Sequence, residues 1–142
     1  MKILLAADGS EYTVKAARFV AKHVKGFKTA PEVFVHHVVA PLPYAAGAMR
    51  AVGKKTVDDY QREEADAALE VAVRELGEAG KNAVATYTVG DVATELKAFV
   101  AKHKVDLVVM GCRGHGAIAG MALGSVAQKL IATLAAPILI VR

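Results

Sequence analysis

Five short apolar runs, separated by longer segments of helical periodicity, constrain the fold of this 142-residue chain more than any other feature. A short, continuously apolar run indicates a strand buried on both faces, and the alternation in the third run suggests partial exposure. Connections long enough to hold a helix are typical of parallel strands, and each such unit is right-handed. The pattern predicts an α/β fold, an open parallel five-stranded sheet with helices on both faces. The predicted strands cover 3–7, 33–39, 84–89, 107–110 and 138–141.

The segments between these runs carry helix starts and stops. Ser10 and Asp91 are good N-caps, because their side-chain oxygens can accept hydrogen bonds from the first turn of a helix. The first helix should run over about 11–25 and end at Gly26, and a long helix should begin at Thr56.

The stretch 41–55 is the least regular part of the chain. Its prolines, glycines and alanines predict a mobile connection after the second strand, which could cover a ligand. Arg50, Lys54 and Lys55 could reach a phosphate from there, or they could be solvated.

A glycine-rich loop joins the fourth predicted strand to a helical pattern that begins at Gly124-Ser125. A strand, a loop and a helix N-terminus in this order form a common anion-binding device, because the free N–H groups and the helix dipole favour negative charge. Gly111, Gly114 and Gly124 have no Cβ, so they can take φ > 0 and let a phosphate approach the backbone. Arg113 adds a guanidinium that suits phosphate oxygens. The stretch predicts a phosphate or nucleotide cradle.

The same glycines could instead serve turn geometry alone. Their spacing, Gly111-x-x-Gly114-x-Gly116, is not the dinucleotide fingerprint, and no Gly-Lys-Ser/Thr follows as it would in a P-loop. The residues by themselves leave both interpretations open.

Composition excludes several other classes of function. The net charge is +4, but the cations are dispersed and aromatic residues make up only 6%, so nucleic acid is not an expected partner. One cysteine allows no intramolecular disulfide. The apolar run before Asp8 is too short for a signal peptide or a membrane span, which predicts a cytoplasmic protein.

Gly111, Gly114, Gly124 and Ser125 follow the pattern G-x2-G-x9-G-S/T, the nucleotide-binding signature of the universal stress protein family. The opening ILLAADGSEYTVKAARFVAKH, the pair His37-Val38 and the ending AAPILIVR also resemble that family. The chain is similar to the branch that keeps this motif and typically binds ATP; another branch lacks it. The resemblance implies one Rossmann-like nucleotide-binding domain over 1–142, with strand order 3-2-1-4-5.

In that order the first and fourth strands are neighbours, and open α/β sheets bind ligands where the winding reverses between such strands. Family positions then suggest roles: Asp8 near the ribose and adenine, Val38 on the adenine, Met110 as an apolar wall. For Asp8 a turn or helix cap is the alternative. The resemblance and the switch point together imply ten ligand-binding residues: Ala7, Asp8, Val38, Met110, Gly111, Arg113, Gly114, Gly124, Ser125 and Val126.

Three functions are compatible with this sequence. The first is an ATP-binding stress-response module acting as a switch, with Mg²⁺ or Mn²⁺ held by the phosphates. The second is a slow ATPase or self-phosphorylating enzyme, with Ser125 as the nearest hydroxyl. The third is a dimeric interaction protein that needs no nucleotide, against which the intact glycine motif argues.

No catalytic residue and no metal ligand can be assigned, because no general base or metal-ligand cluster is recognisable. His36 and His37 are adjacent on a predicted strand, so their side chains should point to opposite faces and cannot form a same-face metal pair.

The last strand, Ile138–Val141, is apolar and stands at a sheet edge in the order 3-2-1-4-5. An unprotected edge invites pairing with another chain. We therefore expect a two-fold homodimer in which this strand pairs with its copy, as members of the resembled family often do. The alternative is a monomer whose edge is shielded by the neighbouring helix. The sequence names no other protein partner.

Overall fold

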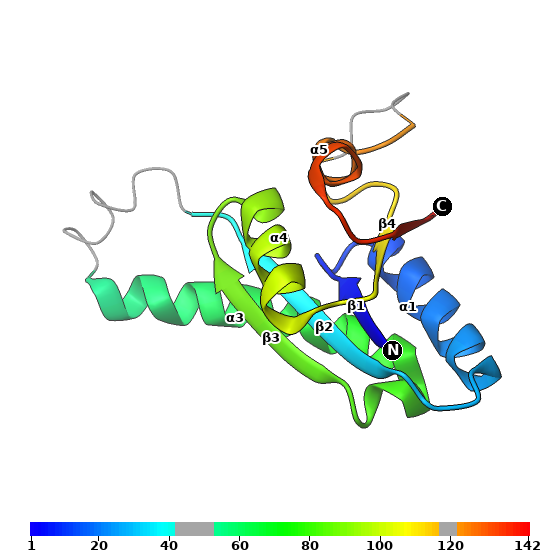
Figure 1. The fold of residues 1–142 in the computed structure, drawn as a ribbon. Helices are drawn as coiled ribbons and strands as arrows, with labels where there is room; N and C mark the ends of the chain where they lie inside the picture. The colour runs from blue at the N-terminus through cyan, green and yellow to red at the C-terminus, as the bar shows by residue number, and fades with distance from the viewer. Residues whose placement is uncertain (42–52, 117–121) are drawn as a thin grey trace.

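The computed structural model describes residues 1–41, 53–116 and 122–142 (Figure 1). It confirms the predicted architecture: one parallel sheet of five strands in the order β3-β2-β1-β4-β5. The predicted strand boundaries are met within one residue. The strands are β1 (Lys2–Ala6), β2 (Glu32–Val39), β3 (Val84–Val89), β4 (Leu107–Gly111) and β5 (Ile138–Val141).

The α-helices of the described residues are α1 (Glu11–His23), α3 (Lys54–Leu76), α4 (Val92–His103) and α5 (Ser125–Thr133). The short 3-10 turns η1 (Val24–Gly26) and η2 (Gly77–Gly80) follow α1 and α3. Ser10 and Asp91 are N-caps as predicted, accepting from the N–H groups of Thr13 and Thr94.

The predicted start of the long helix at Thr56 is two residues late. Its N-cap is Gly53, which has positive φ and no side chain to cap with, so the start lacks the polar signal on which sequence reasoning depends. Lys54 and Lys55 thus belong to α3 and not to the irregular stretch predicted over 41–55. Arg50 lies outside the described residues.

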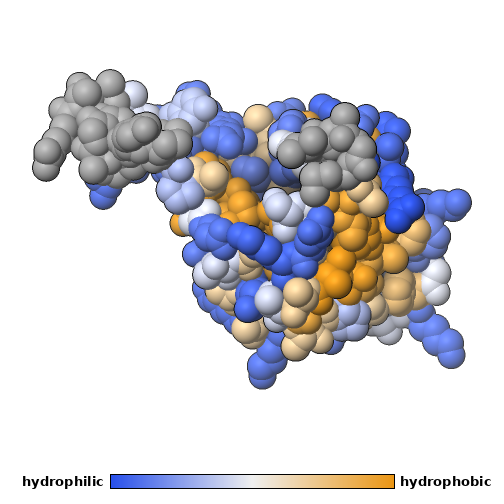
Figure 2. All heavy atoms as spheres, turned by 90° about the horizontal axis from the view of Figure 1, so that it is seen from above, coloured by the Kyte–Doolittle hydropathy of each residue, from blue (hydrophilic) through white to orange (hydrophobic). Residues whose placement is uncertain are grey.

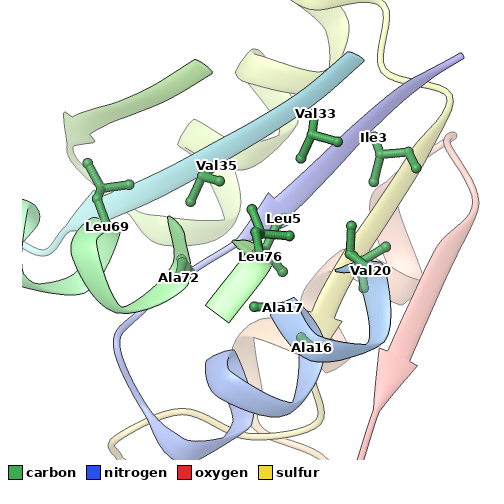
Figure 3. Packing of buried hydrophobic residues seen from close by; sticks show 12 residues of the cluster. Ile3, Leu5, Ala16, Ala17, Val20, Val33, Val35, Leu69, Ala72 and Leu76 are labelled. Carbon is green, nitrogen blue, oxygen red and sulfur yellow. The ribbon is translucent and has the colours of Figure 1, made fainter. Parts of the chain in front are cut away.

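Each face of the sheet carries its own core. α1 and α3 pack on one face, where Leu5 and Val35 meet Ala17 and Leu76 (Figure 3). α4 and α5 pack on the other face, where Leu4 and Val108 meet Phe99 and Leu130. Because β1 contributes alternate residues to both cores, the central strand is fixed from two sides. No helix in the described ranges has the length and apolar composition needed to cross a bilayer.

The register aligns the carboxyl ends of the three central strands. Ala6 of β1 pairs with His36 of β2 on one side and with Met110 of β4 on the other. The segments that leave β1 and β4 therefore start side by side at one edge, where the order of winding reverses. β3 and β5 are the outer strands, as predicted, and all four residues of β5 are half-buried.

Candidate functional site

A cavity of about 230 Å³ opens at the carboxyl ends of β1, β2 and β4. It lies between the segment after β1, the loop after β4 and the start of α5. The structure brings all ten residues named from the sequence to its lining: Ala7, Asp8, Val38, Met110, Gly111, Arg113, Gly114, Gly124, Ser125 and Val126. That these residues bind a ligand remains a prediction.

Hydrogen bonds fix the Asp8 side chain just after the carboxyl end of β1. Its Oδ1 accepts hydrogen bonds from the Ser10 N–H group at 3.0 Å and from the Thr13 hydroxyl at 2.8 Å. The turn-forming role considered as an alternative for Asp8 is therefore real, and it uses one carboxylate oxygen. The other oxygen, Oδ2, packs against Gly114 so closely that a Cβ on that residue would collide with it.

Gly111 and Gly114 are required by space and not by positive φ. The positive-φ glycines of the described chain are Gly9, Gly53 and Gly77, so the expected use of φ > 0 at the loop glycines was wrong. A Cβ on Gly111 would collide with Tyr12 of α1, and a Cβ on Gly114 would collide with the Asp8 carboxylate. The absence of side chains lets the loop pack closely against α1 and the β1 end.

The start of α5 is open. Its N-cap is Gly124, which has φ −72° and offers no side-chain hydrogen bond. The Gly124 N–H group itself donates to the carbonyl of Cys112 at 2.8 Å, so it closes the loop. Ser125, Val126 and Ala127 form the first turn, where N–H groups have no partner inside the helix. These donors, aided by the helix dipole, face a site suited to an anion.

Charge and shape are complementary around this helix start. Arg113 is half-buried, and its Nε is buried without a partner among the described residues. An unpaired guanidinium nitrogen is costly unless a ligand binds it, and phosphate is a good partner. Val38 and Met110 are each 7% exposed and provide an apolar wall. The cavity can thus hold a molecule with an anionic end and a flat apolar end.

The lining also contains residues outside that set of ten, among them Thr13, His37 and His115. His37 Nδ1 donates to the Ala7 carbonyl at 2.7 Å, and its Nε2 is buried without a partner in the described chain. His115 Nε2 donates to the Asp8 carbonyl at 2.8 Å, tying the β4 loop to the β1 end. Nothing in their sequence spacing signals these contacts, which join residues 30 and 107 positions apart.

The two adjacent histidines do face opposite sides. His36 stacks on Phe99 of α4 at 4.3 Å, while His37 also lines a small cavity against Ala68 and Val71 of α3. Within the described residues, no group of three histidine, cysteine or acidic side chains could hold a metal ion.

Comparison with known proteins decides the family. The model of the universal stress protein family matches residues 1–142. The chain belongs to the universal stress protein family. Universal stress protein MJ0531 of Methanocaldococcus jannaschii is 30% identical over 142 residues, covering 99% of this chain and 81% of its own. The solved structure of hypothetical protein MJ0577, from the same organism, is 29% identical with a TM-score of 0.74 and covers 99% and 94% of the two chains.

Other solved members of the family share the fold and contain nucleotides. The Archaeoglobus fulgidus protein in complex with dAMP is 21% identical, with a TM-score of 0.69 over 100% of this chain and 98% of its own. The Arabidopsis thaliana protein with AMP bound is 14% identical, with a TM-score of 0.67 over 99% and 90%. Nucleotide binding thus occurs in the family on this fold.

Proposed function

We propose that this chain is an ATP-binding regulatory module of the universal stress protein family, whose bound state is passed to a partner or to its own dimer. The observation that carries the proposal is the open start of α5 beside the unpartnered Arg113 Nε, in one cavity with the apolar wall. The relatives solved with AMP and dAMP support an adenine nucleotide as the ligand. A cytoplasmic location stays a prediction.

The residues of the cavity fit ATP in three parts. The N–H groups of Ser125 and Val126 and the Arg113 guanidinium would hold phosphates. Asp8 would lie near the ribose, and Val38 with Met110 would enclose the adenine. Because the described residues offer no metal-ligand group, Mg²⁺ or Mn²⁺ would be held by the phosphates. When bound, the metal supplies neutralising charge.

We propose binding without efficient turnover. An efficient phosphoryl-transfer enzyme needs a positioned base or cation set around the γ-phosphate. His115 donates its Nε2 proton to a backbone carbonyl, and one oxygen of the Asp8 carboxylate, Oδ1, accepts from Ser10 and Thr13, so neither side chain belongs to a recognisable base pair. A steady-state rate near the ordinary median of about 10 s⁻¹ would favour the ATPase instead.

The test is ATP binding by calorimetry to the wild type and to Gly114→Val. A Cβ at this position collides with the Asp8 carboxylate, so the variant should lose ATP while keeping its circular dichroism spectrum. Gly26→Val is the matched control, because a Cβ at Gly26 meets nothing within 4 Å and Gly26 lies outside the cavity. Equal ATP binding by wild type and Gly114→Val would refute the site.

We further propose a homodimer through β5 (Ile138–Val141). β5 is an outer strand with half-buried apolar residues, and Figure 2 shows an uninterrupted hydrophobic area on the side where β5 lies in Figure 1. An unpaired apolar edge is a pairing surface, and a two-fold axis closes it.

Sedimentation tests the dimer. Ile140→Lys should convert a dimer into a monomer or an aggregate, because a charge would enter the seam of each subunit. Val84→Lys makes the same change on the opposite outer strand, at a residue that is 44% exposed, and should leave the dimer intact. A wild type that sediments as a monomer at tens of micromolar contradicts the proposal.

A further inference from the structure

The hydroxyl group of Thr13 makes both of its hydrogen bonds with Asp8. Thr13 Oγ1 accepts from the Asp8 N–H group at 2.9 Å and donates to Asp8 Oδ1 at 2.8 Å. Thr13 is 2% exposed, and its own N–H group donates to Ser10 Oγ at 3.4 Å. The buried hydroxyl therefore bonds both the backbone and the side chain of Asp8 and fixes the position of both.

This pair of hydrogen bonds decides which way the Asp8 carboxylate faces. Oδ1 is occupied by Thr13 and Ser10, whereas Oδ2 receives no hydrogen bond from any described residue. Oδ2 lies close enough to Gly114 to collide with a Cβ there, so it points from the β1 end toward the β4 loop. The His115 bond to the Asp8 carbonyl holds the backbone at the same point.

We propose that Thr13 is a positioning residue that aims Asp8 Oδ2 at a hydroxyl group of the bound nucleotide, and so gives the site a preference for ribonucleotides over deoxyribonucleotides. The inference rests on the proposed function, because it assumes a nucleotide in the cavity. A fixed carboxylate oxygen accepts a charge-assisted hydrogen bond, and a ligand that lacks the donor leaves that oxygen unpaired. A carboxylate free to rotate would turn to solvent and lose the discrimination.

The experiment compares ATP, 2′-deoxy-ATP and 3′-deoxy-ATP by calorimetry on wild type, Thr13→Val and Thr13→Ser. Wild type should bind at least one deoxy analogue about tenfold more weakly than ATP. Thr13→Val keeps the shape but removes the hydroxyl, so the gap should shrink to about twofold or less. Thr13→Ser keeps the hydroxyl and should preserve the gap.

Thr94→Val is the matched control. Thr94 Oγ1 donates to Asp91 Oδ1 at 2.7 Å in the same kind of helix start, but Thr94 does not line the cavity. Its loss should change neither the affinity nor the gap. A purely structural role of Thr13 would weaken all three nucleotides by the same factor and leave the gap intact, which would overturn the inference.

The remaining outcomes separate the two proposals. Equal binding of all three nucleotides to wild type overturns the ribose inference and leaves the ATP site standing. No binding of ATP to folded wild type overturns the proposed function and the inference together.

Discussion

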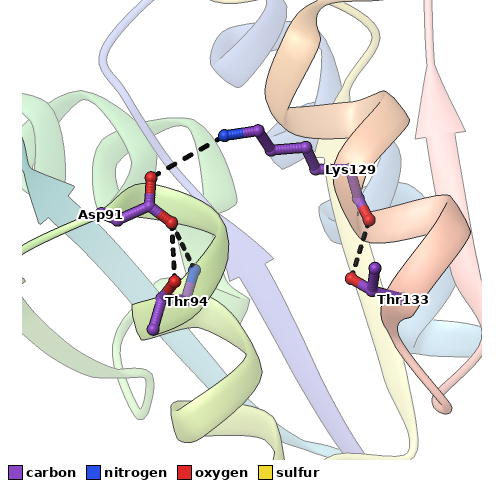
Figure 4. A network of polar contacts seen from close by, with 4 residues as sticks. All are labelled: Asp91, Thr94, Lys129 and Thr133. Carbon is purple, nitrogen blue, oxygen red and sulfur yellow. Dashed lines mark hydrogen bonds and ion pairs between the residues drawn. The ribbon is translucent and has the colours of Figure 1, made fainter.

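Two strand-to-helix junctions at the same edge of the sheet satisfy their polar groups in opposite ways. At the β3–α4 junction, Asp91 Oδ1 accepts from the Thr94 N–H group at 3.0 Å and from the Thr94 hydroxyl at 2.7 Å (Figure 4). At the β4–α5 junction, Gly124 offers no side chain, and Arg113 Nε is buried without a partner in the described chain. The first junction is complete by itself, while the second leaves donors for a ligand.

The adjacent histidines repeat this contrast. On the β3–α4 side, His36 has both ring nitrogens bonded, to the hydroxyls of Thr86 and Thr88, at 2.9 and 3.2 Å. His37 lines the same cavity as His36 but has one partner, the Ala7 carbonyl, among the described residues. Unmet hydrogen-bonding capacity, more than the count of glycines, therefore distinguishes the candidate site from an ordinary helix start.

The largest expected effect comes from closing the open junction with Gly124→Asp. The φ of −72° suits any residue, and a Cβ would be 3.4 Å from the Arg113 Cα, an ordinary contact. The new carboxylate should cap α5 and stabilise the protein by a few tenths of a kcal/mol. It should also repel phosphate and lower ATP affinity about 100-fold, by calorimetry.

Gly124→Asn is the matched control, since it adds a neutral cap of nearly the same shape. The difference in ATP affinity between the Asp and Asn variants isolates the effect of charge. Undiminished ATP binding by Gly124→Asp would mean that no phosphate binds at the start of α5.

The second expected effect is a loss of folding stability at low pH, caused by His36 on the β3–α4 side. Burial lowers the pKa of His36 to about 4 from 6.5, and the nearby His37 and His103 also lower it, whereas the Thr86 bond opposes the shift. The unfolded chain therefore binds a proton between pH 6.5 and pH 4 that the folded chain does not. This single group should make unfolding easier by about 2 kcal/mol on going from pH 7.5 to pH 5.

Urea unfolding at the two pH values measures that loss. In His36→Gln the loss between pH 7.5 and pH 5 should shrink, because the titrating ring is gone. An unchanged loss in the variant would mean that His36 does not govern the acid sensitivity.

The fold could be predicted because apolar runs and caps are local signals. The runs gave β1 to β5 within one residue, and Ser10 and Asp91 announced two helix starts. The start of α3 was missed because Gly53 carries no capping side chain.

The site could be predicted only as a set of residues. The glycine spacing marked the loop, but the reason for Gly114 is the Asp8 carboxylate, which comes from the other end of the chain. The hydrogen bonds from Thr13 and His115 to Asp8 depend on side-chain rotamers and on strand order. Neither of these can be read from the residue pattern of a single sequence.

A smaller effect is expected from opening the closed junction with Asp91→Ala. The Thr94 hydrogen bonds, first, and the Lys129 charge lower the pKa of Asp91, so the carboxylate is the form that caps α4. Its removal should lower the melting temperature by about 3 °C and leave ATP affinity unchanged. A loss of ATP affinity as large as the loss in Gly124→Asp would show that the two junctions act as one site.

The smallest effect concerns the ion pair that joins the two sides. Lys129 of α5 lies 3.9 Å from Asp91 Oδ2, and its side chain is 64% exposed (Figure 4). An exposed pair at this distance is screened by solvent, so Lys129→Gln should shift the melting temperature by less than about 1 °C. Asp91→Asn keeps an oxygen acceptor for Thr94 and removes only the charge, which completes a double-mutant cycle. Near-zero coupling energy in that cycle would mean that the N-termini of α4 and α5 are stabilised independently of each other. Coupling well above that of exposed pairs would mean that the starts of α4 and α5 stabilise each other.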